Sequence, residues 1–495
     1  MGKNSLKLVY ARKIYASFKP LRVYKAMLIE NGIVKELYKD DLIEGTRVDE
    51  IIDLRNYYII PAFIDAHIHL DEVGEKVSYV DLSRARSISD IQEFLLKYSE
   101  SKGGWIVGRG FDHENLKEKR MPTRHDIDKI INNRPVIIIR VDGHSAVLNS
   151  YALEILRIES SDGVIKENEL FRVLERIREE RMLKEEKEIL VKAQEEFLKN
   201  GVTTVGFMSC DLKALRALSE LKFEGKLKLR VMVYLTPSAF DKTNIKDYDE
   251  GGMLRVNGVK LFPDGSFGSR TALLTLPYND DPLNYGVEVM KKDDMLEYCR
   301  RVNENGLQCA IHAIGDKALD NVLDVFEKIK FPKNRIEHAS LIREDQFDRL
   351  RTIRPIVVVQ PHFLVSDFWI VERLGVERLK NVYPFRRILD SGLIMAFSTD
   401  APVEPINPWE TIEASINRGV ISSYTKEEGL SLLDAMDCYT RHSALAVDRN
   451  DIGMLLEGYR ADFVVLDNDI YSQERKIIRV YLDGEIVYPM GNSND

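Results

Sequence analysis

The stretch Ile60–Asp71 reads IPAFIDAHIHLD and gives the strongest structural signal in the chain. Its apolar run begins at Ile59 and has the length and bulk of a strand buried on both faces. The run leads into His67 and His69, and because side chains alternate along a strand, the two imidazoles project to the same side. Two histidines that close a buried strand favour metal ligation over a surface pair on an exposed strand, which is the alternative.

Seven further apolar segments follow, separated mostly by helical patterns. They lie at residues 202–208, 229–235, 256–262, 308–312, 335–339, 355–360 and 393–400. Gly201, Gly306 and Gly392 stand between a helical pattern and the next strand, where a left-handed helix cap is favoured. Eight strands that alternate with helices predict an α/β fold, a (β/α)₈ TIM-type barrel, whose chemistry lies at the carboxyl ends of its strands.

Short strand patterns at both ends of the chain predict a second, smaller domain. The turn signals Asn31-Gly32 and Asp483-Gly484 lie within these patterns. The simplest organisation is a small β-sandwich domain built from residues 1–58 and 446–495, which packs beside a barrel of residues 59–445. Mixed helix and strand patterns over about residues 72–168 predict an αβ insertion after the first barrel strand.

Composition places the chain among ordinary soluble globular proteins, with 44% hydrophobic and 31% charged residues. A net charge of -9 provides no broad basic field for nucleic acid, so no such partner is expected. No run approaches the roughly 18 apolar residues that a membrane span needs, so no membrane partner is expected either. The N-terminal segment lacks a secretory signal pattern, and a cytoplasmic location is the expectation. We expect a small-molecule substrate, and the sequence leaves a homo-oligomer open.

Polar side chains stand at or just beyond the ends of the predicted barrel strands. They are His67, His69, Lys260, His312, His338 and Asp400. A random scatter of nine histidines would not place four at strand ends, so the set predicts a metal centre. The alternative is that each is a satisfied buried side chain, and for Lys260 pairing with Asp264 or another acid is a strong alternative. The remaining histidines that we considered are interpreted as surface or structural: His113, His125, His362 and His442.

Several motifs occur in order along the chain: DAHIHL, WIVGRGFDHENL, VDGHSAVLNSYAL, GVKLFPDGSFGSRTALL, HAIGDKALD, RIEHA, FSTDAPV and GYRADFVVLD. With them the sequence resembles the amidohydrolase superfamily of metal-dependent hydrolases, and more narrowly its amidohydrolase-3 (YtcJ-like) branch, over nearly the whole chain. The resemblance implies a (β/α)₈ barrel with a composite β-sandwich. It also implies that one ion lies among His67, His69 and Asp400, that a second lies between His312 and His338, and that a carboxylated Lys260 bridges the ions. Without this carboxylation, a one-metal site is favoured.

Zinc, as one or two ions, is the first choice of metal because imidazole-rich sites suit it, although other divalent metals remain open. Zinc lowers the pKa of a bound water from 15.7 to about 7, which supplies hydroxide at neutral pH. Asp400 is placed to take the proton of this water and to pass it to a leaving nitrogen. We therefore predict hydrolysis of a non-peptide C–N bond in an amide, an N-formyl or N-acyl amine, or a cyclic amide. Deamination of a heterocycle is the alternative, and a non-catalytic interaction protein on the same barrel is disfavoured because all the ligand positions are filled.

The family motifs around WIVGRGFDHE, VDGH and DGSFGSRTALL provide candidates for the wall of the substrate pocket. They are Trp105, Asp112, His144, Asp264 and Arg270. The first three belong to the predicted insertion, which follows the first barrel strand and can lie over its mouth. Core packing of Trp105 and an ion pair between Asp112 and Arg270 are the alternatives.

Overall fold

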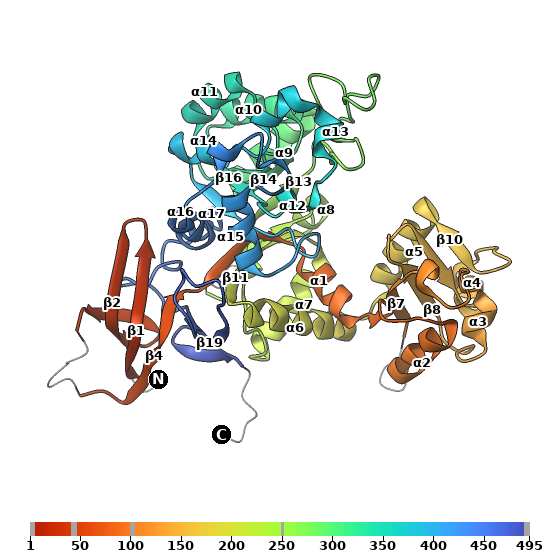
Figure 1. Cartoon of the computed structure of the whole chain (residues 1–495), viewed down its shortest axis with the longest axis horizontal. Coiled ribbons are helices and arrows are strands. Elements are labelled where there is room, and N and C mark those ends of the chain that lie inside the picture. Colours follow the sequence, from red (N-terminus) through yellow and green to blue (C-terminus); the bar gives the residue numbers. More distant parts are fainter. Residues whose placement is uncertain (1–4, 41–46, 100–103, 249–251, 490–495) are drawn as a thin grey trace. The chain divides into compact units, whose positions relative to one another are not determined.

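The computed structural model describes residues 5–40, 47–99, 104–248 and 252–489. The chain forms two compact units (Figure 1): unit 1 comprises Met1–Val73 and Ala193–Asp495, and unit 2 comprises Gly74–Lys192. Two of the three sheets belong to unit 1 and one belongs to unit 2. No helix among the described residues is long and apolar enough to cross a membrane.

An eight-stranded parallel sheet forms the core of unit 1. Its strands are β5 (Phe63–Ile68), β11 (Val202–Cys210), β12 (Arg230–Leu235), β13 (Leu254–Leu261), β14 (Gln308–Ala313), β15 (Arg335–His338), β16 (Ile356–Val359) and β17 (Met395–Phe397). Most of them are buried along their whole length, as expected for parallel strands that are covered on both faces. The sheet confirms the (β/α)₈ barrel that the sequence predicts.

The barrel closes where the segment after β17 meets the end of β5. The backbone N–H of Asp400 donates to the carbonyl of His67 over 2.9 Å, and the N–H of His69 donates to the carbonyl of Ala401 over 2.8 Å. Both bonds lie beyond the last residue of β17, Phe397. The closure therefore brings the first and last parts of the barrel together at the carboxyl ends of the strands.

Helices connect the barrel strands and also follow the last of them. They are α1 (Leu70–Ser78), α6 (Leu183–Lys199), α7 (Leu212–Phe223), α8 (Pro237–Phe240), α9 (Lys292–Glu304), α10 (Asp316–Ile329), α11 (Glu344–Ile353), α12 (Phe363–Ser366), α13 (Ile370–Leu374), α14 (Phe385–Asp390), α15 (Pro408–Asn417), α16 (Leu432–Asp437) and α17 (Ser443–Ala446). Gly306 and Gly392 follow α9 and α14 with φ values of 73° and 71°. These are the left-handed conformations that the sequence predicts before β14 and β17.

The amino end of the barrel is plugged by the end of α17. The carbonyl oxygen of Ala446 accepts hydrogen bonds from Tyr234, Gln308 and Arg335, which lie on three different strands. The carbonyl of Val447 accepts a further bond from Asn257 on β13. With the amino end filled in this way, the carboxyl ends of the strands are the end of the barrel where chemistry can take place.

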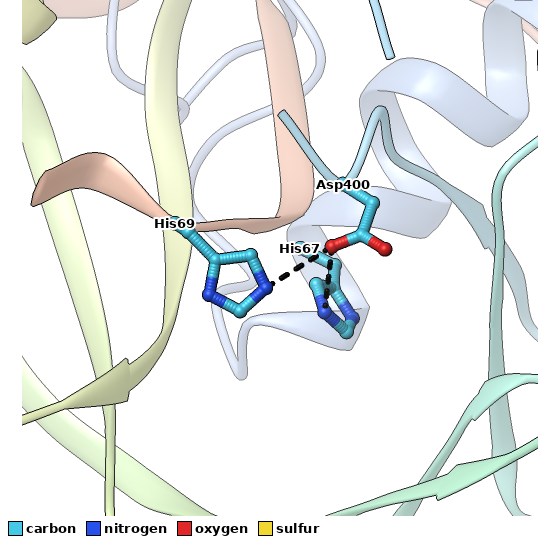
Figure 2. Close-up of side chains that lie close together, drawn as sticks. All are labelled: His67, His69 and Asp400. Atoms are coloured by element: carbon cyan, nitrogen blue, oxygen red, sulfur yellow. Dashed lines mark ion pairs between the residues drawn. The ribbon is translucent and has the colours of Figure 1, made fainter. Parts of the chain in front are cut away.

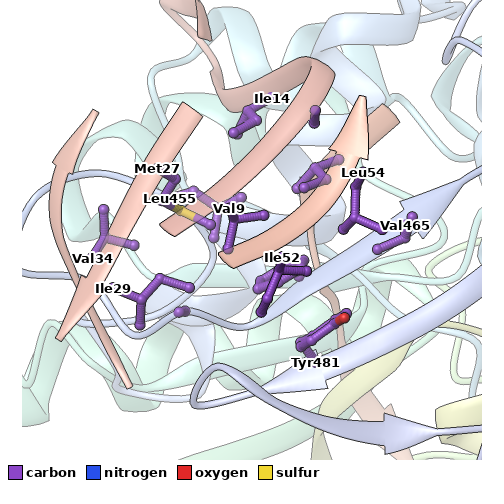
Figure 3. Close-up of a cluster of buried hydrophobic side chains, with 14 of the residues drawn as sticks. Val9, Ile14, Met27, Ile29, Val34, Ile52, Leu54, Leu455, Val465 and Tyr481 are labelled. Carbon is purple, nitrogen blue, oxygen red and sulfur yellow. The ribbon is translucent and has the colours of Figure 1, made fainter. Parts of the chain in front are cut away.

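A seven-stranded mixed sheet joins the two ends of the chain, in the order β20-β19-β18-β4-β1-β2-β3. Its strands are β1 (Leu6–Phe18), β2 (Leu21–Glu30), β3 (Ile33–Tyr38), β4 (Glu50–Pro61), β18 (Phe463–Leu466), β19 (Ile477–Leu482) and β20 (Glu485–Tyr488). Figure 3 shows its core, in which Val9 and Met27 from the N-terminal strands share one cluster with Val465 and Tyr481 from the C-terminal strands. The two chain ends therefore build one β domain.

The turn between β2 and β3 is hydrogen-bonded to the segment that precedes β18 in the same sheet. The carbonyl of Gly32 accepts a hydrogen bond from the N–H of Ala461 over 2.8 Å, and that of Tyr459 accepts one from Val34 over the same distance. Gly32 has a φ of 80°, and a Cβ atom there would lie 2.7 Å from the carbonyl oxygen of Asp483. The close approach explains why glycine occupies this turn.

The sequence run that starts at Ile59 is divided between two sheets, contrary to its interpretation as one barrel strand. Ile59 to Pro61 end β4 and pair with β18, whereas β5 starts at Phe63. Pro61 has no N–H group to donate, and the N–H of Ala62 donates to the carbonyl of Asp462. The pairing with β18 therefore ends here, and the chain continues into the barrel sheet as β5. A continuous apolar run does not show this change, because both strands are buried.

Unit 2 contains a five-stranded mixed sheet in the order β10-β9-β8-β7-β6. Its elements are β6 (Val80–Asp81), α2 (Ile88–Ser99), β7 (Ile106–Phe111), α3 (Arg124–Asp128), β8 (Val136–Arg140), β9 (Ser145–Leu148), α4 (Ser150–Leu156), β10 (Val164–Lys166) and α5 (Glu167–Glu180). Ile138 packs in one hydrophobic cluster and Ile137 and Ile139 pack in another, so both faces of the sheet are covered. The αβ insertion after the first barrel strand is thus present, and its compact unit continues past residue 168 to Lys192.

Candidate metal centre

Two histidines stand at the end of β5. His67 is the fifth residue of this strand and is 1% exposed, whereas His69 follows the strand and its side chain is 19% exposed. Their ring centroids lie 5.7 Å apart. The alternation along β5 therefore places both imidazoles on one side, as the H-x-H spacing predicts.

Asp400 meets both imidazoles from the loop after β17. Figure 2 shows its carboxylate between them, with Oδ1 3.3 Å from Nε2 of His67 and 3.2 Å from Nε2 of His69. The backbone of Asp400 has a φ of 58°, a left-handed conformation that aspartate tolerates better than most residues. Each of the three side chains offers one ligand atom, and these atoms lie within 4.8 Å of one another. The three residues form a triad that can hold a metal ion.

Lys260, His312 and His338 lie on β13, β14 and β15, beside this triad. The rings of His312 and His338 are 4.4 Å apart, and those of His67 and His338 are 5.0 Å apart. Lys260 is completely buried in the strand two places from His338. The structure therefore places all six predicted ligands at the carboxyl ends of barrel strands, on or just after β5, β13, β14, β15 and β17.

Three buried polar atoms of this group have no hydrogen-bond partner: Nζ of Lys260, Nδ1 of His312 and Oδ1 of Asp400. Leaving such atoms unpaired is costly, so their concentration at one place indicates a missing partner. Imidazole nitrogens with carboxylate oxygens are donors that suit zinc and related divalent metals. The residues present therefore fit a metal ion. The alternative pairing of Lys260 with Asp264 is not found between these two described residues.

A second set of side chains fixes the orientation of three histidines. His67 donates from Nδ1 to Glu337 over 2.6 Å, and His338 donates from Nδ1 to the amide oxygen of Gln360 over 2.7 Å. His312 instead donates from Nε2 to the carbonyl of Gly265 over 3.0 Å. These bonds leave the other ring nitrogen of each histidine as the available electron-pair donor. Histidines that bind metals are usually oriented by such a hydrogen bond at the ring nitrogen that does not bind the metal.

Burial sets the charge state of these ligands. Burial and the neighbouring Lys260 lower the pKa of His67 to about 4 and that of His312 to about 3, and burial lowers the pKa of His338 well below its usual value. The three imidazoles are consequently neutral at neutral pH, as metal ligation requires. Burial opposes ionisation of Asp400, but the neighbouring His67 and His69 outweigh it and lower the pKa of this carboxyl.

Burial also changes the charge state of Lys260. Burial lowers its pKa to about 8, against a usual value of 10.5. About a tenth of the side chain is therefore a neutral amine at pH 7, far more than for an ordinary lysine, and a neutral amine is the form that reacts with carbon dioxide.

Asp65 provides a further buried connection between the first and last parts of the barrel. Its carboxylate accepts hydrogen bonds from the N–H and the hydroxyl of Thr399, over 3.0 and 2.6 Å, and from the hydroxyl of Tyr439 over 3.3 Å. Thr399 immediately precedes Asp400, and Asp65 lies two residues before His67. Asp65 therefore helps to hold both sides of the triad.

The predicted substrate residues of unit 1 already have internal partners. Asp264 is 2% exposed and accepts hydrogen bonds from the N–H groups of Leu273, Ile314 and Gly315, so it holds its own loop. Arg270 pairs with Asp280 over 2.9 Å.

The predicted substrate residues Trp105, Asp112 and His144 belong to unit 2. Trp105 packs against the hydrophobic cluster that contains Val107. Asp112 pairs with Arg140 over 3.2 Å within the same unit. His144 is exposed and lies 3.2 Å from Glu167. Their role in the substrate pocket stays a prediction.

The sequence interpretation missed Glu337, Gln360 and Asp65. A signal for two of them was available, because Asp65 interrupts the apolar strand FIDAHI and Glu337 lies in the buried strand RIEH. Inward-facing charges in a buried strand need partners, and in RIEH the pair Arg335 and Glu337 is spaced to share one face.

Comparison with known proteins places this geometry in a family. The model of the amidohydrolase family matches residues 50–488, and the chain belongs to this family. The crystal structure of an uncharacterized metal-dependent hydrolase from Pyrococcus furiosus is similar, with 40% identity, a TM-score of 0.86, and coverage of 94% of this chain and all of that one. The chain is thus a metal-dependent hydrolase of the amidohydrolase superfamily.

Two curated proteins are similar over almost their whole length. The putative amidohydrolase YtcJ of Bacillus subtilis (strain 168) is 29% identical, over 94% of this chain and 96% of that protein. The N-substituted formamide deformylase of Arthrobacter pascens is 24% identical, over 94% of this chain and 95% of that protein.

Proposed function

We propose that this protein hydrolyses a non-peptide C–N bond in an amide, an N-formyl or N-acyl amine, or a cyclic amide. The observation that carries the proposal is the cluster of unpartnered donor atoms on Lys260, His312 and Asp400 beside neutral imidazoles. The similarity to an N-substituted formamide deformylase supports amide chemistry over other hydrolytic reactions.

The residues of the centre would divide between two ions. His67, His69 and Asp400 would hold one, His312 and His338 would hold the second, and a carboxylated Lys260 would bridge them. A divalent metal such as zinc supplies an acidified water and a polarised substrate carbonyl when it is bound. Every other contribution has to come from the side chains of the protein.

The surroundings of Lys260 support its proposed carboxylation. The neutral amine attacks carbon dioxide, a C–N bond forms, and one proton leaves, so that the neutral side chain becomes an anionic carbamate. The product offers two oxygen atoms in place of one unpartnered nitrogen. Burial disfavours the ammonium and therefore favours the neutral amine, which is the form that this reaction consumes.

Asp400 is the proton carrier in this proposal. Its Oδ1 lies between Nε2 of His67 and Nε2 of His69, and its lowered pKa keeps the carboxylate ionised and able to accept a proton from the attacking water. The proton then passes to the nitrogen that leaves as the C–N bond breaks. Glu337 accepts the Nδ1 proton of His67, which leaves Nε2 as the electron-pair donor that this imidazole would offer to a metal.

A substrate screen tests the proposal. Protein supplied with zinc is incubated with a library of N-formyl and N-acyl amines, cyclic amides and amino-heterocycles, and both carboxylate and ammonia are measured. Release of carboxylate and amine, lost after metal removal and in His67→Asn, is the expected result. Release of ammonia from amino-heterocycles alone would replace the proposal with the deaminase alternative.

A further inference from the structure

Two aromatic side chains stand next to the imidazoles of the metal centre. The ring of Phe262, which follows β13, lies 5.6 Å from the ring of His312 and 4.7 Å from Nζ of Lys260. The ring of Phe363, at the start of α12, stacks on His338 with 6.2 Å between centroids and 21° between planes. Both are outside the set of metal ligands, and Phe262 is 39% exposed. Each ring therefore borders the centre with surface left for another molecule.

The charged side chains on the same two loops are committed to each other. Arg270 from the loop after β13 and Arg373 from α13 both pair with Asp280. Asp264, which lies two residues after Phe262, is bound by three backbone N–H groups and is 2% exposed. Asp264 lies 3.5 Å from Nε2 of His312, so the side chains of these loops that border the ligands are the two rings and this one buried carboxylate, which backbone N–H groups already hold.

The loop after β13 and the segment after β16 lie side by side. A Cβ atom at Gly268 would lie 3.2 Å from Cζ2 of Trp369, so the indole packs directly on the glycine backbone. Val403, three residues after Asp400, is 61% exposed. Aromatic and aliphatic surface therefore continues from Phe363 outward along loops of the carboxyl end of the barrel.

We propose that the substrate carries an aromatic group next to its scissile C–N bond, and that Phe262 and Phe363 bind this group; the inference rests on the proposed hydrolysis. Aromatic rings prefer offset-stacked and edge-to-face contacts with other rings, and the two phenylalanines come from different loops that can enclose a flat group. A charged substrate group in the same place would lose its hydration against the apolar rings. The charged side chains of these loops would not compensate for this loss, because they already have partners. Phe262 and Phe363 determine specificity and take no part in bond breaking.

Two substrates with the same acyl group test this proposal: formanilide, which is aromatic, and N-formylglycine, which is acidic. The values of kcat/KM are measured for the wild type and for Phe262→Ala and Phe363→Ala, and each variant is divided by the wild type for the same substrate. This ratio cancels the different intrinsic reactivities of the two amides. We expect a loss of about 10- to 200-fold with formanilide, the usual worth of an apolar pocket contact, and a loss below about threefold with N-formylglycine.

Control variants separate specificity from damage to the centre. Phe223→Ala removes a ring that is 95% exposed at the end of α7 and should leave both ratios near one. Phe262→Leu keeps apolar volume and should recover part of the formanilide rate. Metal content should be unchanged in every variant. Equal losses with both substrates, or no loss with formanilide, would overturn the proposal.

A binding measurement keeps this inference separate from the proposed function. Calorimetry of formanilide with metal-free wild type and Phe262→Ala requires no turnover. If the wild type hydrolyses neither amide, the proposed function fails, while weaker binding to the variant by about tenfold or more still supports the aromatic site. Equal binding to both proteins would contradict it.

Discussion

Two buried cations lie at the same level of the barrel and have opposite surroundings. Lys260 on β13 and Arg335 on β15 both pair in register with Ala310 of the strand between them, and both are 0% exposed. Arg335 donates five hydrogen bonds, to Glu337, Tyr234, Ala446 and Ala66. Lys260 donates none. The same barrel thus satisfies one buried cation completely and leaves the other available for chemistry.

The difference separates two kinds of buried polar group. The bonds of Arg335 connect the plug at the amino end with Glu337, which in turn holds His67, so Arg335 supports the site through its neighbours. The unpartnered atoms lie on the ligand side, on Lys260, His312 and Asp400. A satisfied network gives rigidity, whereas unsatisfied donors are kept where a partner binds.

The largest effect should follow a change to the acid among these unpartnered groups. Asp400→Asn is nearly isosteric and can still offer an oxygen to a metal, but an amide cannot accept the proton of the attacking water. We expect most of the metal to remain and turnover to fall by about 10²- to 10⁴-fold. Turnover and metal content are measured on the same samples. Near wild-type turnover in fully metallated Asp400→Asn would assign proton transfer to another residue.

Of the substitutions at these two cations, Arg335→Met should destabilise the protein more. It removes the charge that lowers the pKa of Glu337 to about 2 and leaves this buried carboxylate without a paired cation, with its hydrogen bond from His67 remaining. We expect a loss of about 3–5 kcal/mol in the free energy of unfolding, measured by denaturant titration of metal-free protein. Lys260→Met is the matched control and should cost far less, because no hydrogen bond is lost. Equal destabilisation by both changes would remove the distinction between the two cations.

The pH dependence of stability sharpens the same comparison. The pKa of Lys260 is about 8 in the folded protein and 10.5 in the unfolded chain, so between these pH values the unfolded chain binds more protons. The free energy of unfolding of metal-free protein should therefore rise with pH over this interval, by about 3 kcal/mol from this residue. The measured quantity is the difference between wild type and Lys260→Met in carbon dioxide-free buffer. Parallel pH profiles for the two proteins would show that Lys260 is not strongly desolvated.

A smaller effect is expected from the partner of His338. Gln360→Leu removes the oxygen that accepts the Nδ1 proton of this histidine, so the ring loses its fixed orientation. Metal affinity should fall by about 10- to 100-fold, measured by competition with a chelator. Gln346→Leu is the matched control, since Gln346 is equally buried but bonds to Asp316 and Asp320. A similar loss of metal affinity in both variants would indicate a general structural effect.

Local sequence patterns were enough to predict the barrel and to bring His67, His69 and Asp400 together. Alternation along β5 places His67 and His69 on one side, and strand ends in a parallel barrel share one edge, so Asp400 could be expected beside them from 330 residues away. The division between β4 and β5 could not be predicted, because apolar residues continue through Pro61 and both strands are buried.

The hydrogen-bond partners of the ligands could not be predicted from local sequence patterns. Glu337 bonds to His67 across 270 positions of sequence, and nothing in the local pattern of RIEH says which imidazole it meets. The role of Phe363 was also not foreseen, because a phenylalanine at the start of a short helix is usually part of a core. Its proposed role rests on its stacking against the ring of His338, which the local sequence does not show.

The state of Lys260 in the purified protein tests the central claim most directly. Protein prepared with zinc and bicarbonate is analysed for metal content, and a crystal structure of the same preparation is examined at Nζ of Lys260. We predict about two metal ions per chain and a carboxyl group on Nζ that bridges them. An ion content at or below one per chain, with an unmodified Lys260 in a well-occupied site, would contradict the two-metal centre proposed here.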